Sequence, residues 1–383
     1  MKKIVQPLAL AIVCAFAAAA QAEENQASRL RAAEAAYQQG DFALAYETLS
    51  ALAEEGYGVA MHSLAELYDD GLGVPQDYQK ALHWYARALP TLEKEAAAGN
   101  GKAQASLGLM YWRGEGVPQD LTLARQWFAK AAPALLNAGI GGDITAQAFV
   151  GEMYAKGWGL PRNEQLAALW KAMAARNGDP GSQFSLGYVY RDGKGVHPNA
   201  ERAYALHEQA GLWFRGAADQ GSGEAQFVIA QLYENGLGVD ADSTEAERWF
   251  VKARETLEHD GQSDPDSQFF LAHIHAQGLG TERDSARALA WMTKAAESGH
   301  AQAQQNLGMM YFQGRGVDTD EAKAAQWMEK AAAQDNEEAQ SLIGWMYEHG
   351  RGVEQNSVTA RHWLEKAAEK GNQSAKDMLE IMP

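Results

Sequence analysis

Three shortages in the sequence narrow the classes of protein to which it can belong. The only cysteine among 383 residues is Cys14, near the start, so the chain that follows has no disulfides and depends on packing for its stability. Beyond residue 20, no apolar run is long enough to cross a bilayer. Basic residues are few, with 33 Lys and Arg against 50 Asp and Glu. This balance argues against nucleic acid and anionic membrane surfaces as partners, and it favours a basic partner.

The first 22 residues have the pattern of a secretory signal peptide. Met1-Lys2-Lys3 is a basic start, residues 4–20 form an apolar run, and Ala20-Gln21-Ala22 is a small-x-small cleavage site. We therefore expect cleavage after Ala22 and a periplasmic or secreted bacterial product. Loss of the two lysines changes the formal net charge from −17 to −19. A membrane anchor is the alternative, which is disfavoured because no stop-transfer pattern follows.

One short motif is written eight times. Gly-x-Gly pairs begin at residues 71, 114, 157, 193, 236, 278, 314 and 350, at spacings of 36, 42 or 43 residues. Counted from the first glycine, every copy has alanine at +10 and +17, Asp or Asn at +6, and Ala or Gly at −6. Three further residues, Tyr at −3, Trp at +13 and Gln at −10, each occur in seven of the eight copies. A period of this length indicates a repeat architecture.

Each recurring position has a structural interpretation. Apolar residues at −7, −4 and −3 share one face of a first helix, glycines end that helix, and Asp or Asn at +6 caps a second helix. The alanines flank the Trp as a seam between helices, so we interpret the Tyr and Trp as core. Longer copies carry six or seven extra residues after +17, about two helical turns. Residues 91–98 are expected to prolong their second helix, whereas Pro133 and Gly139 predict a looser excursion.

The expected fold is all-α, a single continuous solenoid of helix-turn-helix repeats. Residues 23–57 are expected to form a capping hairpin around Gly40-Asp41, and residues 373–383 a final capping helix. The eight repeats span residues 58–100, 101–143, 144–179, 180–222, 223–264, 265–300, 301–336 and 337–372.

The seventh copy shows the full motif as Ala303-Gln304, Leu307-Gly308, Tyr311, Gly314-Arg315-Gly316-Val317, Asp320, Ala324, Trp327 and Lys330-Ala331-Ala332. This motif resembles the Sel-one-like repeat (SLR) family, a relative of tetratricopeptide repeats. The resemblance implies a right-handed α/α superhelix that binds other proteins, with the first helices lining its concave surface. Exported members are similar to envelope adaptors, host-interaction factors and immunity proteins that neutralise toxins. Cysteine-rich members are linked to β-lactam binding, which is in doubt here because the cysteines are absent.

No catalytic, cofactor or metal motif stands out. The Gly-x-Gly pairs follow helices and never complete G-x-G-x-x-G, so they do not indicate a dinucleotide site. His273 and His275 point to different sides of a helix. Asp240, Asp242 and Glu245 resemble a calcium loop only loosely, and helix capping explains Asp242. The sequence therefore predicts a protein without catalytic residues or cofactors.

Variation between copies predicts where a partner binds. Offsets −9, −5 and −2 vary, and their spacing places them on one stripe of the first helix. The aromatic members of this stripe are candidate binding anchors, although they would instead fill gaps if the inner layer were imperfect. The candidates for the concave groove are Trp112, Tyr188, Phe312, Trp345, Leu109, Met309, Arg191, Glu66, Asp69, Glu152, Glu234 and Glu348. A second candidate, Trp213-Phe214-Arg215, binds a partner or repacks the core beside Leu206.

The sequence thus favours a non-catalytic scaffold that binds a protein partner in its groove. An immunity or inhibitor protein for an exported toxin and an envelope adaptor are two forms of this function. The alternatives are a hydrolase of cell-wall or β-lactam compounds and a host-interaction factor. The oligomeric state stays open.

Overall fold

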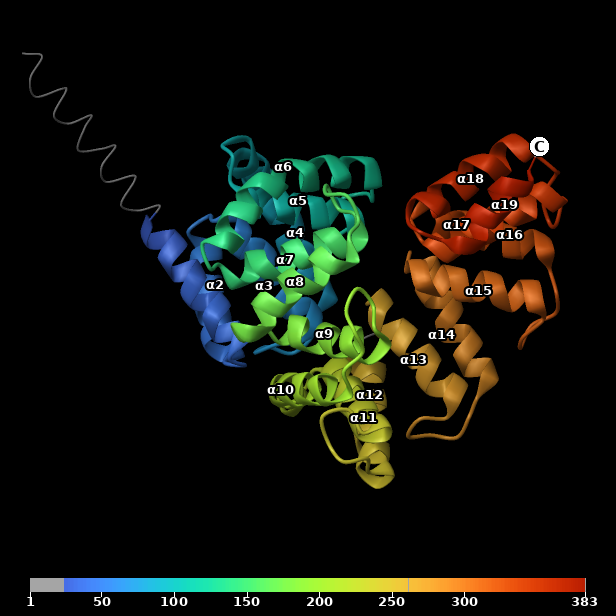
Figure 1. Ribbon diagram of the computed structural model, residues 1–383. Coiled ribbons are helices and arrows are strands. Elements are labelled where there is room, and N and C mark those ends of the chain that lie inside the picture. The colour runs from blue at the N-terminus through green and yellow to red at the C-terminus, as the bar shows by residue number, and fades with distance from the viewer. Residues whose placement is uncertain (1–23, 261, 383) are drawn as a thin grey trace, which may run out of the picture.

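The computed structural model describes residues 24–260 and 262–382, and every regular element in these ranges is a helix (Figure 1). The expected signal peptide and Cys14 lie outside the described residues. A helix over residues 24–38 and α2 (Phe42–Glu54) form the N-terminal hairpin. Asp41 at its turn accepts a hydrogen bond from the Leu44 N–H at 3.1 Å. The all-α solenoid predicted from the sequence is confirmed.

Each repeat is a pair of packed helices, and every first helix has 13 residues. The pairs are α3 (Gly58–Asp70) with α4 (Tyr78–Ala97), α5 (Gly101–Arg113) with α6 (Leu121–Ile140), α7 (Ile144–Lys156) with α8 (Glu164–Arg176), α9 (Pro180–Asp192) with α10 (Ala200–Asp219), α11 (Gly223–Asn235) with α12 (Ser243–Asp260), α13 (Pro265–Gln277) with α14 (Ser285–Glu297), α15 (Ala301–Gln313) with α16 (Glu321–Ala333), and α17 (Glu337–His349) with α18 (Ser357–Glu369). A last helix, α19 (Gln373–Ile381), packs on α18 without a partner of its own.

The turn chemistry predicted from the motif is confirmed. Gly114 ends α5 with a φ of 80°, a left-handed conformation that favours glycine. At Gly116 a Cβ atom would lie 2.9 Å from the backbone nitrogen of Ala86, so only glycine lets the turn approach the preceding repeat. Asp120 then caps α6 by accepting from the Leu123 N–H at 2.9 Å. The same cap recurs at the Asp or Asn of the other repeats.

In most repeats the residue that wedges the two helices apart is at +14, although Trp170 and Trp249 at +13 are buried as well. Phe128 at +14 is fully buried, and a Cβ atom on Gly108 at −6 would lie 2.4 Å from its ring. The spacing of +10, +14 and +17 places this residue between the two alanines on one face, whereas +13 lies at the edge of that face. Accordingly, Trp127 is only half-buried, with the Lys130 ammonium 4.1 Å from its ring centroid.

Consecutive repeats are joined by the glutamine at −10. Its side-chain amide donates to a backbone carbonyl in the last turn of the preceding second helix, eight residues earlier, at 2.8–3.1 Å in six repeats. Each of these carbonyls also accepts from the backbone N–H three residues further on, so the glutamine adds a second hydrogen bond that ties the helix end to the next repeat. The glutamines are Gln104, Gln147, Gln183, Gln226, Gln304 and Gln340.

All four insertions prolong second helices. The helices α4, α6 and α10 have 20 residues and α12 has 18, against 13 in the second helices of the other repeats. The looser excursion predicted around Pro133 is wrong, because α6 continues through this proline to Ile140. Pro90 occupies the same place in α4. Two added turns keep the packed face in register, so packing on the next repeat outweighs the lost backbone hydrogen bond.

The repeats follow an arc in which α2–α9 form one arm, α10–α12 the base and α13–α19 the other arm (Figure 1). The base contacts the start of the chain through Trp213 of α10, whose indole packs on the rings of Tyr37 and Phe42 with centroids 5.4 and 5.1 Å away. This tryptophan comes from the insertion considered above as a second binding site. It closes the arc instead.

The two arms also contact each other. Arg125 of α6 pairs with Asp335 at 2.5 Å, in the turn before α17. Arg162, just before α8, pairs with Glu337 at 3.0 Å. The arc therefore curves far enough for the second and third repeats to reach the last two. Within the described ranges, no helix combines the length and the apolar character needed to cross a membrane.

Candidate functional site

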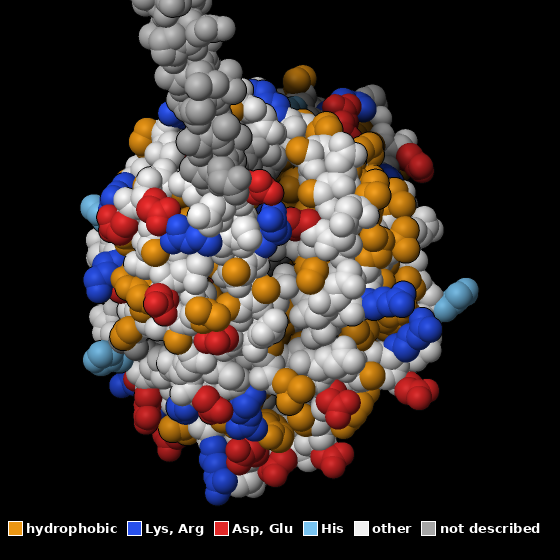
Figure 2. All heavy atoms as spheres, turned by 90° about the vertical axis from the view of Figure 1, so that its left-hand side faces the viewer, with side chains coloured by type: hydrophobic (Ala, Val, Ile, Leu, Met, Phe, Trp, Pro, Cys, Tyr) orange, Lys and Arg blue, Asp and Glu red, His pale blue; other side chains and the backbone are white. Residues whose placement is uncertain are grey.

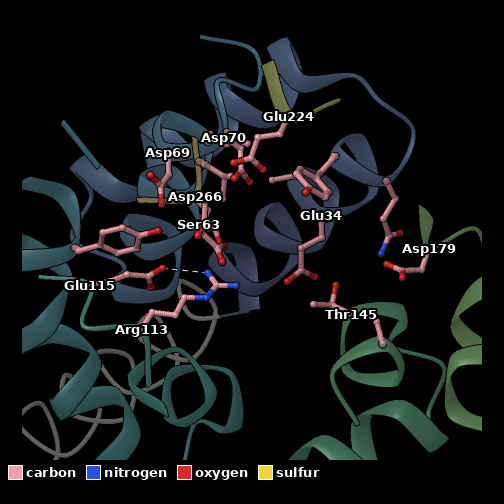
Figure 3. A pocket seen from close by; sticks show the side chains of 18 residues that line it. Glu34, Ser63, Asp69, Asp70, Arg113, Glu115, Thr145, Asp179, Glu224 and Asp266 are labelled. Atoms are coloured by element: carbon pink, nitrogen blue, oxygen red, sulfur yellow. Dashed lines mark hydrogen bonds and ion pairs between the residues drawn. The ribbon is translucent and has the colours of Figure 1, made fainter. Parts of the chain in front are cut away.

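The inner side of the arc contains a hollow of about 460 Å³, near its N-terminal end (Figure 3). The first helices α3, α5, α7, α11 and α13 contribute to its wall, together with the helix over 24–38, α2 and α4. The lining residues are Ala33, Glu34, Tyr37, Gln38, Leu49, Ser63, Glu66, Leu67, Asp69, Asp70, Tyr85, Arg113, Glu115, Thr145, Ala148, Asp179, Glu224 and Asp266. Repeats distant in sequence thus share one concave surface.

The lining is strongly acidic, with eight carboxylates against one guanidinium. Figure 3 shows Asp69, Asp70, Glu224 and Asp266 gathered on one side of the hollow. By contrast, Asp/Glu and Lys/Arg side chains alternate over the outer face that carries the N-terminal helices (Figure 2). The excess of negative charge is therefore concentrated inside the arc on this part of the molecule.

The local sequence of α3 explains much of this concentration. Glu66, Asp69 and Asp70 are three and four positions apart, so one face of the last turn carries all three carboxylates. Carboxylates at a helix C-terminus face the negative end of the helix dipole, and α3 has no basic residue in its last turn. In an isolated helix, these three carboxylates would therefore destabilise the last turn of α3.

Proton affinities in the hollow reflect the crowding. Burial, reinforced by Glu66 and by Asp264 and Asp266, raises the pKa of Asp70 to about 7. Burial and the neighbouring aspartates raise the pKa of Asp69 and of Glu224 well above the usual range. Several of these carboxyl groups therefore hold their protons at pH values where an ordinary carboxyl is ionised.

Of the twelve predicted groove residues, Glu66 and Asp69 line this hollow. The aromatic candidates are half-buried and lie in separate clusters. Phe312 and Trp345 contact each other with centroids 5.9 Å apart, beside Met309. Trp112 packs instead on Trp158 at 4.8 Å, in a cluster that includes Leu109.

Tyr188 belongs to a third cluster, with Phe184 at 5.1 Å and His207 at 4.8 Å. Arg191 lies over the Tyr188 ring at 4.6 Å and pairs with Asp192 at 2.7 Å. The stripe therefore offers several separated aromatic patches rather than one continuous surface.

The remaining acidic candidates differ in how they are paired. Glu152 forms an ion pair with the Lys171 ammonium at 2.6 Å. Glu234 is exposed on α11. Glu348 is half-buried, and its Oε2 atom is buried without a hydrogen-bond donor.

Sequence reasoning missed most of the hollow, although a signal was present. Asp70 and Arg113 stand at −1, and Glu224 and Asp266 stand at −12. Offsets −12, −9, −5 and −1 continue the variable stripe by one turn at each end, at helical spacing. Reading the full length of the first helix, rather than its middle, would have found these residues.

The weak metal candidates have structural roles. Asp242 caps α12 by accepting from Thr244 and Glu245 N–H groups at 2.9 and 3.0 Å. His273 packs on Phe269 at 4.6 Å, and His275 is 3.5 Å from Glu258. No group of three or more His, Asp or Glu residues in the described ranges is arranged to hold a metal ion.

Comparison with known proteins identifies the repeats. The family model described as Sel1 repeat matches residues 58–89, 101–132, 144–179, 180–212, 223–255, 265–300, 301–336 and 337–372. No curated protein matches the chain.

Three solved structures illustrate the relationship. A Sel1 repeat protein from Oxalobacter formigenes is 30% identical over 87% of this chain and 89% of its own, with a TM-score of 0.40. A protective antigen of uropathogenic Escherichia coli strains with an SLR fold is 28% identical over 95% and 90%, with a TM-score of 0.30. An immunity protein from Pseudomonas aeruginosa is 15% identical over 63% and 88%, with a TM-score of 0.41. On the eight matched repeats, which cover more than half of its length, the chain belongs to the Sel1 repeat family.

Proposed function

We propose that this protein is an exported, non-catalytic scaffold that captures a protein partner with a basic segment on the inner side of its arc. Sel1 repeats form a scaffold suited to protein binding. The export component rests on the signal-peptide pattern of residues 1–22. Inhibition of an exported toxin and assembly of an envelope complex are two forms of the same capture, and the identity of the partner distinguishes them.

The observation that carries the proposal is that recurring and variable positions have different roles. Recurring residues serve packing: all sixteen alanines at +10 and +17 are buried, and the glutamines form hydrogen bonds with the backbone. Variable positions of the first helices supply the acidic hollow and the half-buried aromatic patches. Aromatic side chains beside uncompensated charge are typical anchors for a charged partner.

The test is differential capture. Wild-type protein, a Trp112→Ala/Tyr188→Ala/Trp345→Ala variant and a control variant would each be used to capture proteins from the cell-envelope fraction. The control Leu169→Ala/Tyr204→Ala/Val358→Ala removes three exposed apolar side chains from second helices. We expect a basic protein that is retained by the wild type and the control and lost from the first-helix variant.

Circular dichroism of each variant checks that the helices persist. Equal capture by a folded first-helix variant would move the binding surface to the second helices or the outer face. The hydrolase alternative predicts turnover of a chromogenic β-lactam or of peptidoglycan fragments. Such turnover, abolished by substitutions in the hollow, would replace the scaffold proposal.

A further inference from the structure

The acidic hollow differs from an ordinary solvated surface because its charges are not balanced by the protein. Arg113 donates to Glu115 at 3.0 Å, and Lys102 donates to Glu34 at 2.7 Å. Arg113 is thereby committed to Glu115, and Lys102 pairs with Asp143 at 3.1 Å in addition to Glu34. Asp266 is 3.2 Å from a ring nitrogen of His300.

Apart from Asp179, which caps α9 by accepting from the Ser182 N–H, four carboxylates are left without a cationic partner of this kind, namely Glu66, Asp69 and Asp70 of α3 and Glu224 of α11. His62 is 3.7 Å from Glu66, but burial lowers the pKa of this histidine to about 4, so it is neutral at neutral pH. In the empty hollow, burial and like charges therefore favour the protonated form of these carboxyl groups, and a cationic ligand would favour the ionised form.

Two further polar atoms in the same wall lack a partner. Tyr85 is fully buried, lines the hollow, and its hydroxyl forms no hydrogen bond. Glu115 is 7% exposed, and although its Oε1 atom accepts from Arg113, its Oε2 atom has no donor. Buried polar atoms are nearly always satisfied in native proteins, so these two point to a ligand that supplies donors.

The distribution of the groups selects the kind of ligand. The carboxylates are not arranged to hold a metal ion among the described residues, and a single ammonium would neutralise only one of the four. Between the acidic groups the wall is apolar, with Ala33, Leu49, Leu67 and Ala148. A ligand with several N–H donors separated by short methylene chains matches both features. The volume lies within the range of small-molecule pockets.

We propose that the hollow binds a linear aliphatic polyamine, with its ammonium groups on the carboxylates of α3 and α11 and its methylene groups against the apolar wall. This inference goes beyond the capture of a protein partner and does not depend on it, although both use the negative charge of the hollow. A ligand bound there would bridge the first repeat to the fifth and sixth, which supply Glu224 and Asp266. It would thus favour the closed arc.

Isothermal titration calorimetry of the whole chain with spermidine tests the proposal. At neutral pH and physiological ionic strength we expect one molecule bound per chain. Affinity is expected to fall in the order spermidine, putrescine, butylamine, with no competition from equimolar magnesium chloride. An Asp70→Asn/Glu224→Gln variant should bind spermidine at least roughly tenfold more weakly, which corresponds to about 1.4 kcal/mol. Tyr85→Phe should also weaken binding, because it removes an unpaired acceptor.

A control that removes the same charge elsewhere, Glu282→Gln/Glu365→Gln, should bind spermidine like the wild type, because both side chains are exposed outside the hollow. Equal weakening in the control, many sites per chain, or full competition by magnesium would reduce the effect to nonspecific screening and overturn the proposal. If the hollow variant failed to fold, the amine series on the wild type would still decide, because equal affinity for butylamine and spermidine contradicts a polyamine site.

Discussion

The indole nitrogen of Trp213 donates a hydrogen bond to the backbone carbonyl of Tyr37 at 2.8 Å, across 176 positions of sequence. The carbonyl belongs to the last turn of the helix over 24–38, where it also accepts from the Gly40 N–H at 3.0 Å. The indole is therefore a second donor to this helix end, and it comes from the fourth repeat. The N-terminal hairpin caps the first repeat and is also held by the base of the arc.

The first prediction concerns this contact. Trp213→Ala removes the hydrogen bond and three aromatic contacts, and we expect a loss of about 2–3 kcal/mol in the free energy of unfolding. Trp213→Phe keeps a ring but loses the donor and should cost about 1 kcal/mol. Chemical denaturation measures both. Leu212→Ala is the matched control. The Leu212 side chain, next in sequence to Trp213, is 76% exposed, so its truncation should leave the free energy of unfolding unchanged. Equal stability of Trp213→Ala and the control would contradict a role in closure.

Much of the fold was predictable because the same physical constraint is repeated eight times. Glycines at the turns, the Asp or Asn cap and the buried alanines each leave a fixed residue type at a fixed offset. The wedge at +14 was not found, because Tyr85, Phe128, Met328 and even His207 can fill the same space, so size is constrained but identity is not. Closure of the arc was also missed. It depends on the small rotation between repeats, which no local pattern records.

The second prediction concerns the glutamine that joins repeats. Gln226 is fully buried, donates to the Ala218 carbonyl at 3.1 Å and accepts from the Thr256 hydroxyl at 2.9 Å. Gln226→Leu leaves the Thr256 hydroxyl without its acceptor in the interior, whereas the Ala218 carbonyl still accepts from the Gly221 N–H at 3.2 Å, so we expect a loss of about 1–2 kcal/mol in the free energy of unfolding. Thermal unfolding would compare this variant with Gln302→Leu. Gln302 is exposed and stands two positions before the motif glutamine Gln304, so its substitution should change the stability little. A neutral Gln226→Leu would mean that water replaces the amide.

The third prediction concerns the contact between the arms. Exposed ion pairs contribute only about 0–1 kcal/mol each, so the pairs Arg125–Asp335 and Arg162–Glu337 should hold the arc closed without controlling its folding. Arg125→Ala/Arg162→Ala should leave the melting temperature almost unchanged and increase the radius of gyration in small-angle X-ray scattering. High salt should expand the wild type in the same way, because it screens these pairs. Arg248→Ala, which breaks a pair within one helix, is the control and should not expand the protein. An unchanged radius in the double variant would show that the two ion pairs do not hold the arc closed.

The fourth prediction concerns the pH dependence of the acidic hollow. The groups that face Asp70 are Glu66, Arg113, Asp264, Asp266 and Glu224, so like charges outnumber the single cation. Its pKa in the folded protein is about 7, against an ordinary value of 3.8. The folded state therefore holds a proton that the unfolded state has released. The stability that this proton confers is complete below about pH 4 and is lost as the pH rises through 7.

Asp70→Asn mimics the protonated form at every pH. Relative to the wild type, the variant should be equally stable near pH 4 and more stable by about 1–2 kcal/mol near pH 8, where solvent screening limits the gain. Chemical denaturation across this range gives the difference in the free energy of unfolding between the variant and the wild type. The contribution of the buried histidines cancels in this difference, because both proteins contain them. Asp77→Asn should behave in the opposite sense. Its cap bond to the Lys80 N–H lowers the pKa of Asp77, so the wild-type carboxylate stabilises the fold above pH 4 and that advantage disappears in acid. A loss of stability in Asp70→Asn at pH 8 would mean that a cation on the protein compensates this carboxylate, and the hollow would then have no unmet charge to offer a ligand.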